Sequence, residues 1–286
     1  MFKNQKLASP DVSLCTEENL QRFLKQRNSF TVDQQQKLKD QIDNSSKCWQ
    51  MWNKVRWDAA MNSQGVQELK EYLGKKFIPY YDSSWGLAEE WNALERKSKE
   101  LVEDFYRKTS DYMYNSIIFY NSGDRDDLHS SFNTLKEHYQ IATVIDYGCG
   151  TGNDGLKMIE GGTKVIFVDF QSPTFEFLQW RLARRGISSD MYELIDLDAA
   201  KNRQISADLF WSVDVIEHMY NPLDIFLFIN KKTKFAAHFT DADDTAGGRH
   251  PFHFKINKAL LKNEFKNRNF IELDYPLLNV WKRMMN

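Results

Sequence analysis

The sequence predicts an α/β protein in which an all-helical region precedes a mainly parallel sheet of seven strands. Three observations support this fold class. Residues 1–125 are rich in Gln, Lys, Glu and aromatic side chains and lack the alternation of apolar and polar residues that marks strands. From residue 144 onward, short apolar runs alternate with segments of helical character, as in parallel sheets with helices on both faces. A turn with three glycines, at 148–152, directly follows the first apolar run.

In the helical region, Thr16 and Ser45 are typical residues for the start of a helix. The sequence predicts helices at 16–26, 32–42, 46–61, 66–73 and 87–120. A further helix, at 128–139, would pack against the sheet. Residues 121–127 combine turn residues with a run of charge and form the best linker in the chain. We therefore expect two domains, a helical cap at 1–125 and a sheet domain at 126–286.

The sheet domain begins with a strand that runs from Val144 into the glycine turn, and a second strand, 164–170, ends on an acid and a phenylalanine. Later apolar runs predict five more strands, at 191–195, 207–212, 233–240, 269–275 and 279–285. Helices are expected at 153–160 and 224–229. The last two strands are separated by three residues only, so that their connection is unusually short.

Residues 144–152 read Val-Ile-Asp-Tyr-Gly-Cys-Gly-Thr-Gly. Only glycine combines a backbone with positive φ and room for a ligand to approach the main chain. The helix that follows would direct its unpaired N–H groups at a ligand carboxylate. A dinucleotide-binding G-x-G-x-x-G motif that starts at Gly148 would need a glycine at position 153, where the chain has Asn153. An ordinary turn is the other alternative, but the strand, the acid and the glycines occur together.

This nonapeptide resembles the S-adenosylmethionine loop of class I methyltransferases, and Asp-Val-Ile-Glu-His at 214–218 resembles the branch of that family that acts on small molecules, such as the ubiquinone-biosynthesis O- and N-methyltransferases. The resemblance covers about residues 128–286. It implies a Rossmann-like methyltransferase sheet with an antiparallel edge strand at its end. It also implies S-adenosylmethionine as cofactor and methyl transfer to an oxygen or nitrogen of a small metabolite of natural-product, sugar or amino-acid type. Enzymes directed at amides or nucleobases tend to carry Asn-Pro-Pro-Tyr at this place, and the chain has none.

The resemblance also implies roles for individual residues. Asp146 would orient the sulfonium or amino end of the cofactor, and Asp169, 17 residues after Gly152, would bind the ribose hydroxyls. Phe170 would cover one face of adenine. Either Asp196 or Asp198 would accept a hydrogen bond from the adenine amino group; solvated surface carboxylates are the alternative for these acids. The complete predicted cofactor site is Asp146, Tyr147, Gly148, Cys149, Gly150, Gly152, Asp169, Phe170, Asp196, Leu197, Asp198, Ser212, Val213 and Asp214.

The residues around the methyl acceptor are predicted from their positions after the strands of the expected sheet. Ligands bind beyond the carboxyl ends of parallel strands, so the loop at 241–254 should overhang the acceptor, with Gly247 and Gly248 giving it freedom to move. The most specific hypothesis is that a side chain there acts as a general base on the acceptor. Alignment of acceptor, methyl group and sulfur alone can, however, suffice for methyl transfer. The candidate catalytic residues are His250, His253, His218 and Glu217. The candidate substrate-binding residues are Tyr106, Tyr112, Tyr114 and His238. No metal site is expected, because Asp241, Asp243, His250 and His253 match no metal-binding spacing.

Composition limits the alternatives. The net charge of −2 gives no electrostatic footprint for nucleic acid, and the densest basic cluster is Lys231, Lys232 and Lys234. Without an apolar run of 18 residues or a signal sequence, a soluble cytoplasmic protein is expected. Its three cysteines are too few and too scattered to predict a disulfide framework. A nucleic-acid-modifying methyltransferase and a noncatalytic cofactor-binding subunit stay open, as does the oligomeric state.

Overall fold

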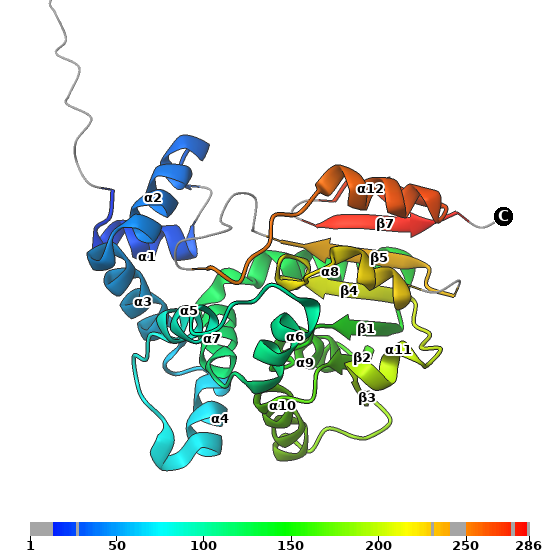
Figure 1. The fold of residues 1–286 in the computed structure, drawn as a ribbon, viewed down its shortest axis with the longest axis horizontal. Coiled ribbons are helices and arrows are strands. Elements are labelled where there is room, and N and C mark those ends of the chain that lie inside the picture. The colour runs from blue at the N-terminus through cyan, green and yellow to red at the C-terminus, as the bar shows by residue number, and fades with distance from the viewer. Residues whose placement is uncertain (1–13, 27–28, 230–231, 241–249, 276–277, 285–286) are drawn as a thin grey trace, which may run out of the picture.

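The computed structural model describes residues 14–26, 29–229, 232–240, 250–275 and 278–284 (Figure 1). Seven strands form one sheet in the order β3-β2-β1-β4-β5-β7-β6. The strands are β1 (Thr143–Tyr147), β2 (Lys164–Asp169), β3 (Tyr192–Asp196), β4 (Leu209–Val213), β5 (Phe235–Phe239), β6 (Phe270–Leu273) and β7 (Asn279–Arg283). The first five are parallel to one another, whereas β7 is antiparallel to both of its neighbours. The predicted seven-stranded, Rossmann-like α/β fold is confirmed.

The last strand is antiparallel as expected, but its predicted place at the edge of the sheet is wrong. β7 lies between β5 and β6, and β6 forms the edge. Burial explains this order. Val280 and Trp281 of β7 are almost completely buried, whereas Ile271 of β6 is 44% exposed. The short connection lets β7 turn back along β6, and its apolar residues reach the core only from the inner position.

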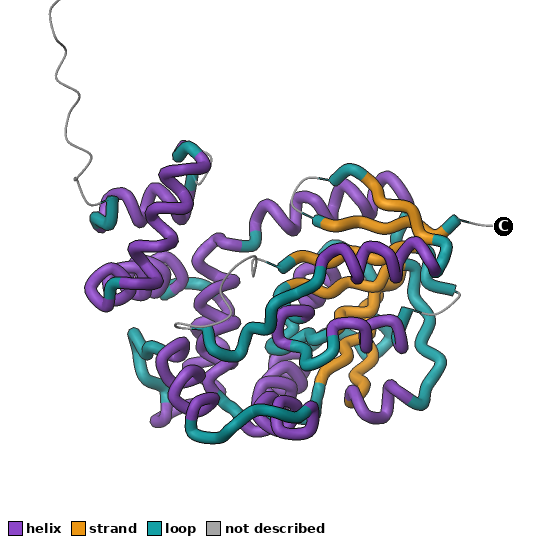
Figure 2. Tube along the Cα trace, turned by 45° about the horizontal axis from the view of Figure 1, so that its top comes forward, coloured by secondary structure: helices purple, strands orange, loops and turns teal. Residues whose placement is uncertain are grey.

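Helices cover both faces of the sheet (Figure 2). Side chains of successive strand residues point to opposite faces, so that in β1 Val144 packs on one side and Ile145 on the other. The first face carries α8 (Asp126–Tyr139), α9 (Asn153–Glu160) and α10 (Pro173–Arg184), and the second carries α11 (Leu197–Lys201), a 3₁₀ helix (Pro222–Leu227) and α12 (Lys258–Asn267). In the described part of the chain, no helix has the length and apolar character to cross a membrane.

The N-terminal region is helical, as predicted, and its first helices lie close to the predicted bounds. They are α1 (Glu17–Lys25), α2 (Val32–Asn44), α3 (Ser46–Ala60) and α4 (Gln64–Leu73). Both expected caps form: the Thr16 side chain accepts a hydrogen bond from the backbone of Asn19, and the Ser45 side chain accepts one from Cys48.

The single long helix predicted at 87–120 is wrong, because three helices occupy this stretch. They are α5 (Ser83–Asn92), α6 (Lys99–Lys108) and α7 (Asp111–Phe119). Ser98 has extended backbone and caps α6 through the backbone N–H of Leu101, and Thr109 is extended where α6 ends. These two local breaks outweigh the continuous helical pattern of the sequence. As a result the chain turns twice, and Tyr106 of α6 comes to lie beside Tyr112 of α7.

The predicted linker at 121–127 is mostly helical. A π-helical turn (Tyr120–Asp124) leads out of α7, and Gly123, at φ 103°, makes the kink before α8 begins. A left-handed backbone of this kind favours glycine. The connection between the helical region and the sheet is therefore short and bent, and the domain boundary at 125/126 stays a prediction.

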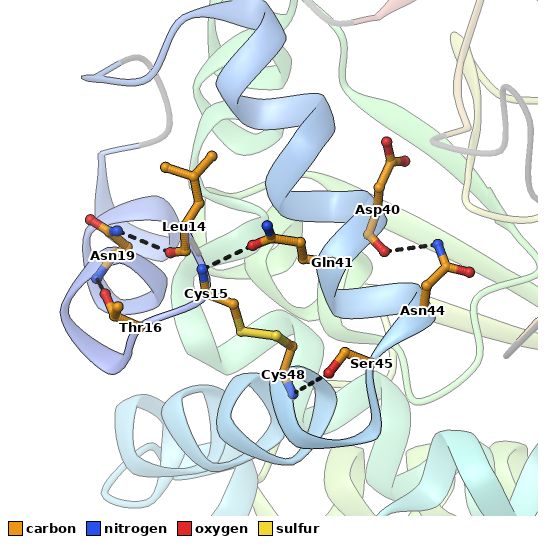
Figure 3. The surroundings of a disulfide bond; sticks show 9 residues. All are labelled: Leu14, Cys15, Thr16, Asn19, Asp40, Gln41, Asn44, Ser45 and Cys48. Atoms are coloured by element: carbon orange, nitrogen blue, oxygen red, sulfur yellow. Dashed lines mark hydrogen bonds between the residues drawn. A yellow bond between two sulfur atoms is a disulfide. The ribbon is translucent and has the colours of Figure 1, made fainter. Parts of the chain in front are cut away.

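A disulfide bond joins Cys15, just before α1, to Cys48 in the first turn of α3 (Figure 3). The sequence predicts no disulfide framework, and this single bond forms because α1 and α2 fold back and bring the Cα atoms of Cys15 and Cys48 within 5.8 Å. The backbone N–H of Cys15 also donates to the side chain of Gln41, 3.0 Å away. Disulfides persist mainly in oxidising compartments, so this bond argues against the cytoplasmic localisation expected above.

We predict that reduction of this disulfide lowers the free energy of unfolding by about 3 to 4 kcal/mol, because the bond restricts the unfolded chain over a separation of 33 residues. Urea denaturation with and without a reductant measures the difference. Cys149, the described free cysteine, supplies the control: Cys149→Ser should respond to the reductant like the unchanged protein. Cys48→Ser should show no response, and identical midpoints for the unchanged protein in both conditions would contradict the prediction.

Candidate functional site

A cavity of about 440 Å³ lies where β1, β2 and β4 end. The glycine loop after β1 forms one side of it. Helices α2, α3, α6 and α7 and the segment 250–253 supply the rest, so that the helical region closes over the carboxyl ends of the strands. The sheet and the helical region thus share one site, in the place that parallel sheets offer to ligands.

The three glycines of the loop differ in what surrounds their missing side chains. All have positive φ, at 67° for Gly148, 54° for Gly150 and 72° for Gly152. A Cβ on Gly148 would lie 2.6 Å from Val215, and one on Gly152 would lie 2.3 Å from Leu178, so both positions are closed by packing. A Cβ on Gly150 would meet no atom closer than 3.8 Å. Gly150 is therefore the glycine whose missing side chain leaves space in the cavity.

Two acids, the buried Asp146 and the partly buried Asp169, hold this loop in place. Asp146 accepts a hydrogen bond from the backbone N–H of Gly155, 3.1 Å away, and thereby ties the end of β1 to the first turn of α9. Asp169 accepts one from Gly150 at 2.6 Å and one from Phe170 at 2.7 Å. Burial raises the pKa of both carboxyls, well above the usual value for Asp146 and to about 6 for Asp169.

The region predicted to bind adenine is only partly in place. Phe170 and Leu197 line the cavity, but Asp196 and Asp198 do not. Asp196 caps α11 and accepts backbone hydrogen bonds from residues 171, 198 and 199. Asp198 forms an ion pair with Arg107 at 2.7 Å. The structure thus gives both acids partners within the protein, and neither acid lines the cavity.

The residues after β4 extend the site towards α8. Tyr147, Cys149, Val213 and Asp214 line the cavity, whereas Ser212 is fully buried in the sheet and does not. Asp214 has a left-handed backbone at φ 51°. Its carboxylate forms an ion pair with Arg125 at 2.7 Å.

Arg125 is not among the residues that the sequence predicts for the site, yet it lines the cavity. The guanidinium is also 3.8 Å from Asp154, which accepts a hydrogen bond from Trp211 at 3.0 Å and lies 3.4 Å from His129. Burial raises the pKa of Asp154, but Arg125 and His129 outweigh it and lower the value to about 2. Nε and Nη1 of Arg125 are buried without a hydrogen-bond partner among the described residues. In the sequence, Arg125 is one charge within an apparent linker, which explains why it was missed.

A cluster of histidines and tyrosines forms the far side of the cavity. Nδ1 of His218 lies 3.1 Å from the hydroxyl of Tyr106 and 3.5 Å from that of Tyr112. The ring of His253 lies between those of His218 and His250, with centroids 4.6 Å and 4.9 Å away. All five side chains line the cavity. Burial lowers the pKa of His218 to about 3 and that of His253 to about 2, so both rings are neutral at physiological pH.

Glu217 also lines the cavity, and its side chain is buried. Burial, with Asp214 nearby, raises the pKa of Glu217 to about 8. Its Oε2 atom has no hydrogen-bond partner among the described residues. A carboxyl that is buried, without a partner on one oxygen and with a pKa about one unit above neutral pH is suited to proton transfer.

Two predicted substrate residues lie elsewhere. The hydroxyl of Tyr114 accepts a hydrogen bond from the backbone of Ile78 at 2.8 Å, and its ring packs in the helical core. His238 is buried in β5, where its ring stacks on Phe265 and accepts a hydrogen bond from Trp281 at 3.4 Å. Neither side chain lines the cavity. Gly247, Gly248 and the acids at 241 and 243 lie outside the described residues.

No family model and no curated protein matches the chain. Among solved structures, the chain is similar to magnesium protoporphyrin IX methyltransferase from Synechocystis PCC 6803, with 11% identity over 81% of this chain and 97% of that one and a TM-score of 0.45. It is also similar to 1,6-didemethyltoxoflavin-N1-methyltransferase from Burkholderia thailandensis, with 16% identity over 60% and 87% and a TM-score of 0.43. The cyclase SpnF matches at 15% identity, over 53% and 60%, with a TM-score of 0.41. These likenesses are too weak to transfer an activity, so the function must follow from the site.

Proposed function

We propose that the protein is an S-adenosylmethionine-dependent methyltransferase that acts on an oxygen or nitrogen of a small metabolite. The observation that supports this most is the glycine loop. Gly150 turns with positive φ and leaves its side-chain space free at the cavity, while Asp169 ends the next strand and holds the amide of Gly150. The family that the sequence resembles binds its cofactor with such a loop and acid.

The residues that line the cavity fit this cofactor. The carboxylate of Asp169 has lone pairs left to accept hydrogen bonds from ribose hydroxyls, and the ring of Phe170 offers apolar surface to adenine. Arg125, with two nitrogens that lack a hydrogen-bond partner among the described residues, would bind the carboxylate of the methionine end. The methyl group would then lie towards the residues that follow β4.

When bound, S-adenosylmethionine supplies a methyl group whose bond to sulfur breaks with the electron pair staying on sulfur. The acceptor must lose a proton, and Glu217 is the best candidate to take it, because its pKa of about 8 lies near neutral pH. His218 and His253, with pKa values of about 3 and 2, are weak bases. Their neutral rings, together with His250, would position the acceptor by hydrogen bonds and contact.

The basic cluster of the sequence gives little support to a nucleic-acid substrate. Lys234 forms an ion pair with Asp208 at 2.8 Å, and these residues precede β5 and β4. They therefore lie at the amino ends of β4 and β5, whereas the cavity lies at the carboxyl ends of β1, β2 and β4. A noncatalytic subunit would not require a buried carboxyl at the cavity with one oxygen, Oε2 of Glu217, left without a hydrogen-bond partner among the described residues. Methyl transfer by the purified protein to small molecules, without nucleic acid or a partner protein, would separate the three functions.

Calorimetry tests the cofactor directly. We expect S-adenosylhomocysteine to bind, and nicotinamide adenine dinucleotide to give no heat, because position 153 lacks the glycine that a dinucleotide loop requires. Binding of the dinucleotide with no heat from S-adenosylhomocysteine would overturn the proposal.

We predict that Asp169→Asn weakens S-adenosylhomocysteine binding by about 1 to 3 kcal/mol at pH 8, since a neutral amide accepts hydrogen bonds less strongly than a carboxylate. In the unchanged protein, the affinity should be constant above pH 7 and fall about tenfold per unit below pH 6. The sign follows from the raised pKa of about 6, below which Asp169 is protonated and loses its charge. Calorimetric titrations from pH 5 to 8 measure both effects.

The variant Asp198→Asn is the matched control, because it removes a carboxylate that follows the neighbouring strand and does not line the cavity. Its affinity and pH dependence should equal those of the unchanged protein. If Asp169→Asn retained the steep loss of affinity below pH 6, the titrating group would be another residue.

A further inference from the structure

The wall of the cavity beside Glu217 consists of aromatic rings from segments far apart in the sequence. Tyr106 of α6 and Tyr112 of α7 have ring centroids 5.7 Å apart, and both lie within 6 Å of the imidazole of His218. Phe252 stacks on His218, with the centroids 5.7 Å apart and the planes inclined by 24°. All four rings line the cavity. Their contacts with one another fix their orientation, so that the wall is rigid before any ligand arrives.

Further aromatic side chains line the same cavity from the helical region. Trp49 and Trp52 come from α3, and Phe119 comes from the end of α7. The ring of Trp49 lies 6.3 Å from that of His250, so the aromatic lining continues from α3 to the segment 250–253. A ligand between the glycine loop and these helices would meet ring faces and edges over much of its surface.

Around His218 the polar groups of this wall are hydroxyls and imidazoles, and the charged group nearest the rings of α3 and α7 is Arg56, whose guanidinium lies over Trp52 and Phe119. His218 has its Nδ1 beside the two tyrosine hydroxyls, so its ring is already partnered. The imidazole of His253 makes no hydrogen bond with a described residue, and its Nδ1 is among the buried atoms without a partner. A neutral imidazole donates one hydrogen bond and accepts another. Together with Glu217, His253 is therefore left to bind a polar atom of the ligand.

We propose that the acceptor is a flat aromatic or heteroaromatic molecule whose hydroxyl or ring N–H lies against His253 and Glu217, an inference that rests on the methyl transfer proposed above. Each contact between aromatic rings adds about 0.5 to 1.5 kcal/mol to the burial of apolar area. At this wall a sugar or an amino acid would place several hydroxyls or charges against ring faces, and each polar group left without a hydrogen-bond partner costs about 1 to 3 kcal/mol. The wall therefore favours aromatic acceptors over these two classes.

Two probes of equal carbon skeleton test the inference. Naphthol is flat and aromatic, whereas decahydronaphthol has the same hydroxyl on a saturated skeleton. Protein saturated with S-adenosylhomocysteine is titrated with each probe by calorimetry. We expect naphthol to bind about tenfold more tightly, the equivalent of one or two ring contacts.

Phe252→Leu removes one ring of the wall and keeps apolar volume, so it should reduce this preference several-fold. Tyr139→Leu, which removes a ring outside the cavity, should leave the preference unchanged. Retained affinity for S-adenosylhomocysteine checks the fold of each variant, and the two probes on the unchanged protein decide the matter even if a variant does not fold.

The outcomes separate this inference from the proposed function. If S-adenosylhomocysteine binds but the two probes bind with equal affinity, or neither probe binds, the aromatic acceptor is overturned. The methyltransferase proposal then still stands. Failure of S-adenosylhomocysteine to bind would overturn both.

Discussion

Gly150→Val is expected to abolish binding of S-adenosylhomocysteine while the protein stays folded. A Cβ at this position would meet no protein atom closer than 3.8 Å, so a valine side chain would occupy the space that we assign to the cofactor. The backbone φ of 54° adds strain of about 1 to 2 kcal/mol for a residue with a Cβ, and a branched side chain resists this conformation further. The same change at Gly148 or Gly152 would collide with Val215 or Leu178 and disturb folding. Calorimetry for binding and thermal melting for the fold measure the result.

Gly162→Val is the matched control. Gly162 has φ 81° and nothing within 4 Å of a Cβ, so the substitution imposes similar backbone strain outside the cavity. It should lower the melting temperature by a comparable amount and leave S-adenosylhomocysteine affinity intact. A Gly150→Val protein that melts like this control and still binds the cofactor would show that the loop does not form the cofactor site.

Glu217→Gln is expected to lower the rate of methyl transfer by about 10² to 10⁴ if the buried carboxyl removes the acceptor proton. The amide has almost the same shape but cannot take a proton, so S-adenosylhomocysteine affinity should be nearly unchanged. Transfer of a labelled methyl group from S-adenosylmethionine into the small molecules of a cell extract measures the rate, and this assay does not require the acceptor to be identified first.

The pH profile distinguishes a base from a structural residue. Glu217 has a raised pKa of about 8, so its carboxylate form is lost below that value. The rate of the unchanged protein should therefore rise about tenfold per unit up to pH 8 and then level off, and the profile of Glu217→Gln should be flat in this range. His253→Asn should weaken the acceptor's binding more than the maximal rate. Equal rates for Glu217→Gln and the unchanged protein would leave alignment as the mechanism.

The sequence predicted the parts of the site that depend on local pattern. A glycine turn after a buried strand can be recognised from a few consecutive residues. An acid at the end of the next strand must lie at the same edge of the sheet as that turn, because the two strands are parallel. For this reason Gly150, Asp169 and Phe170 lie at the cavity. The same holds for Glu217 and His218, which follow β4 directly.

The residues whose surroundings the sequence could not predict depend on contacts between distant segments. Asp196 and Asp198 follow a strand as Asp169 does, but α11 and Arg107 bind them instead. Tyr114 lies two residues after Tyr112, and that spacing turns it towards the opposite side of α7, into the helical core. Arg125 reaches Asp214 across 89 positions of sequence, a pairing that no local pattern reveals.

The place of β7 inside the sheet has a consequence for biosynthesis. Until this segment has left the ribosome, the edge of β5 has unpaired backbone groups on the side where β7 will lie, and β6 has no partner. Exposed strand edges are templates for association with other chains. Because β7 follows β6 in the chain and carries the buried Trp281, the sheet closes only after residues 279–283 have been synthesised. Chains cut short before Asn279 should therefore aggregate rather than fold into a smaller sheet.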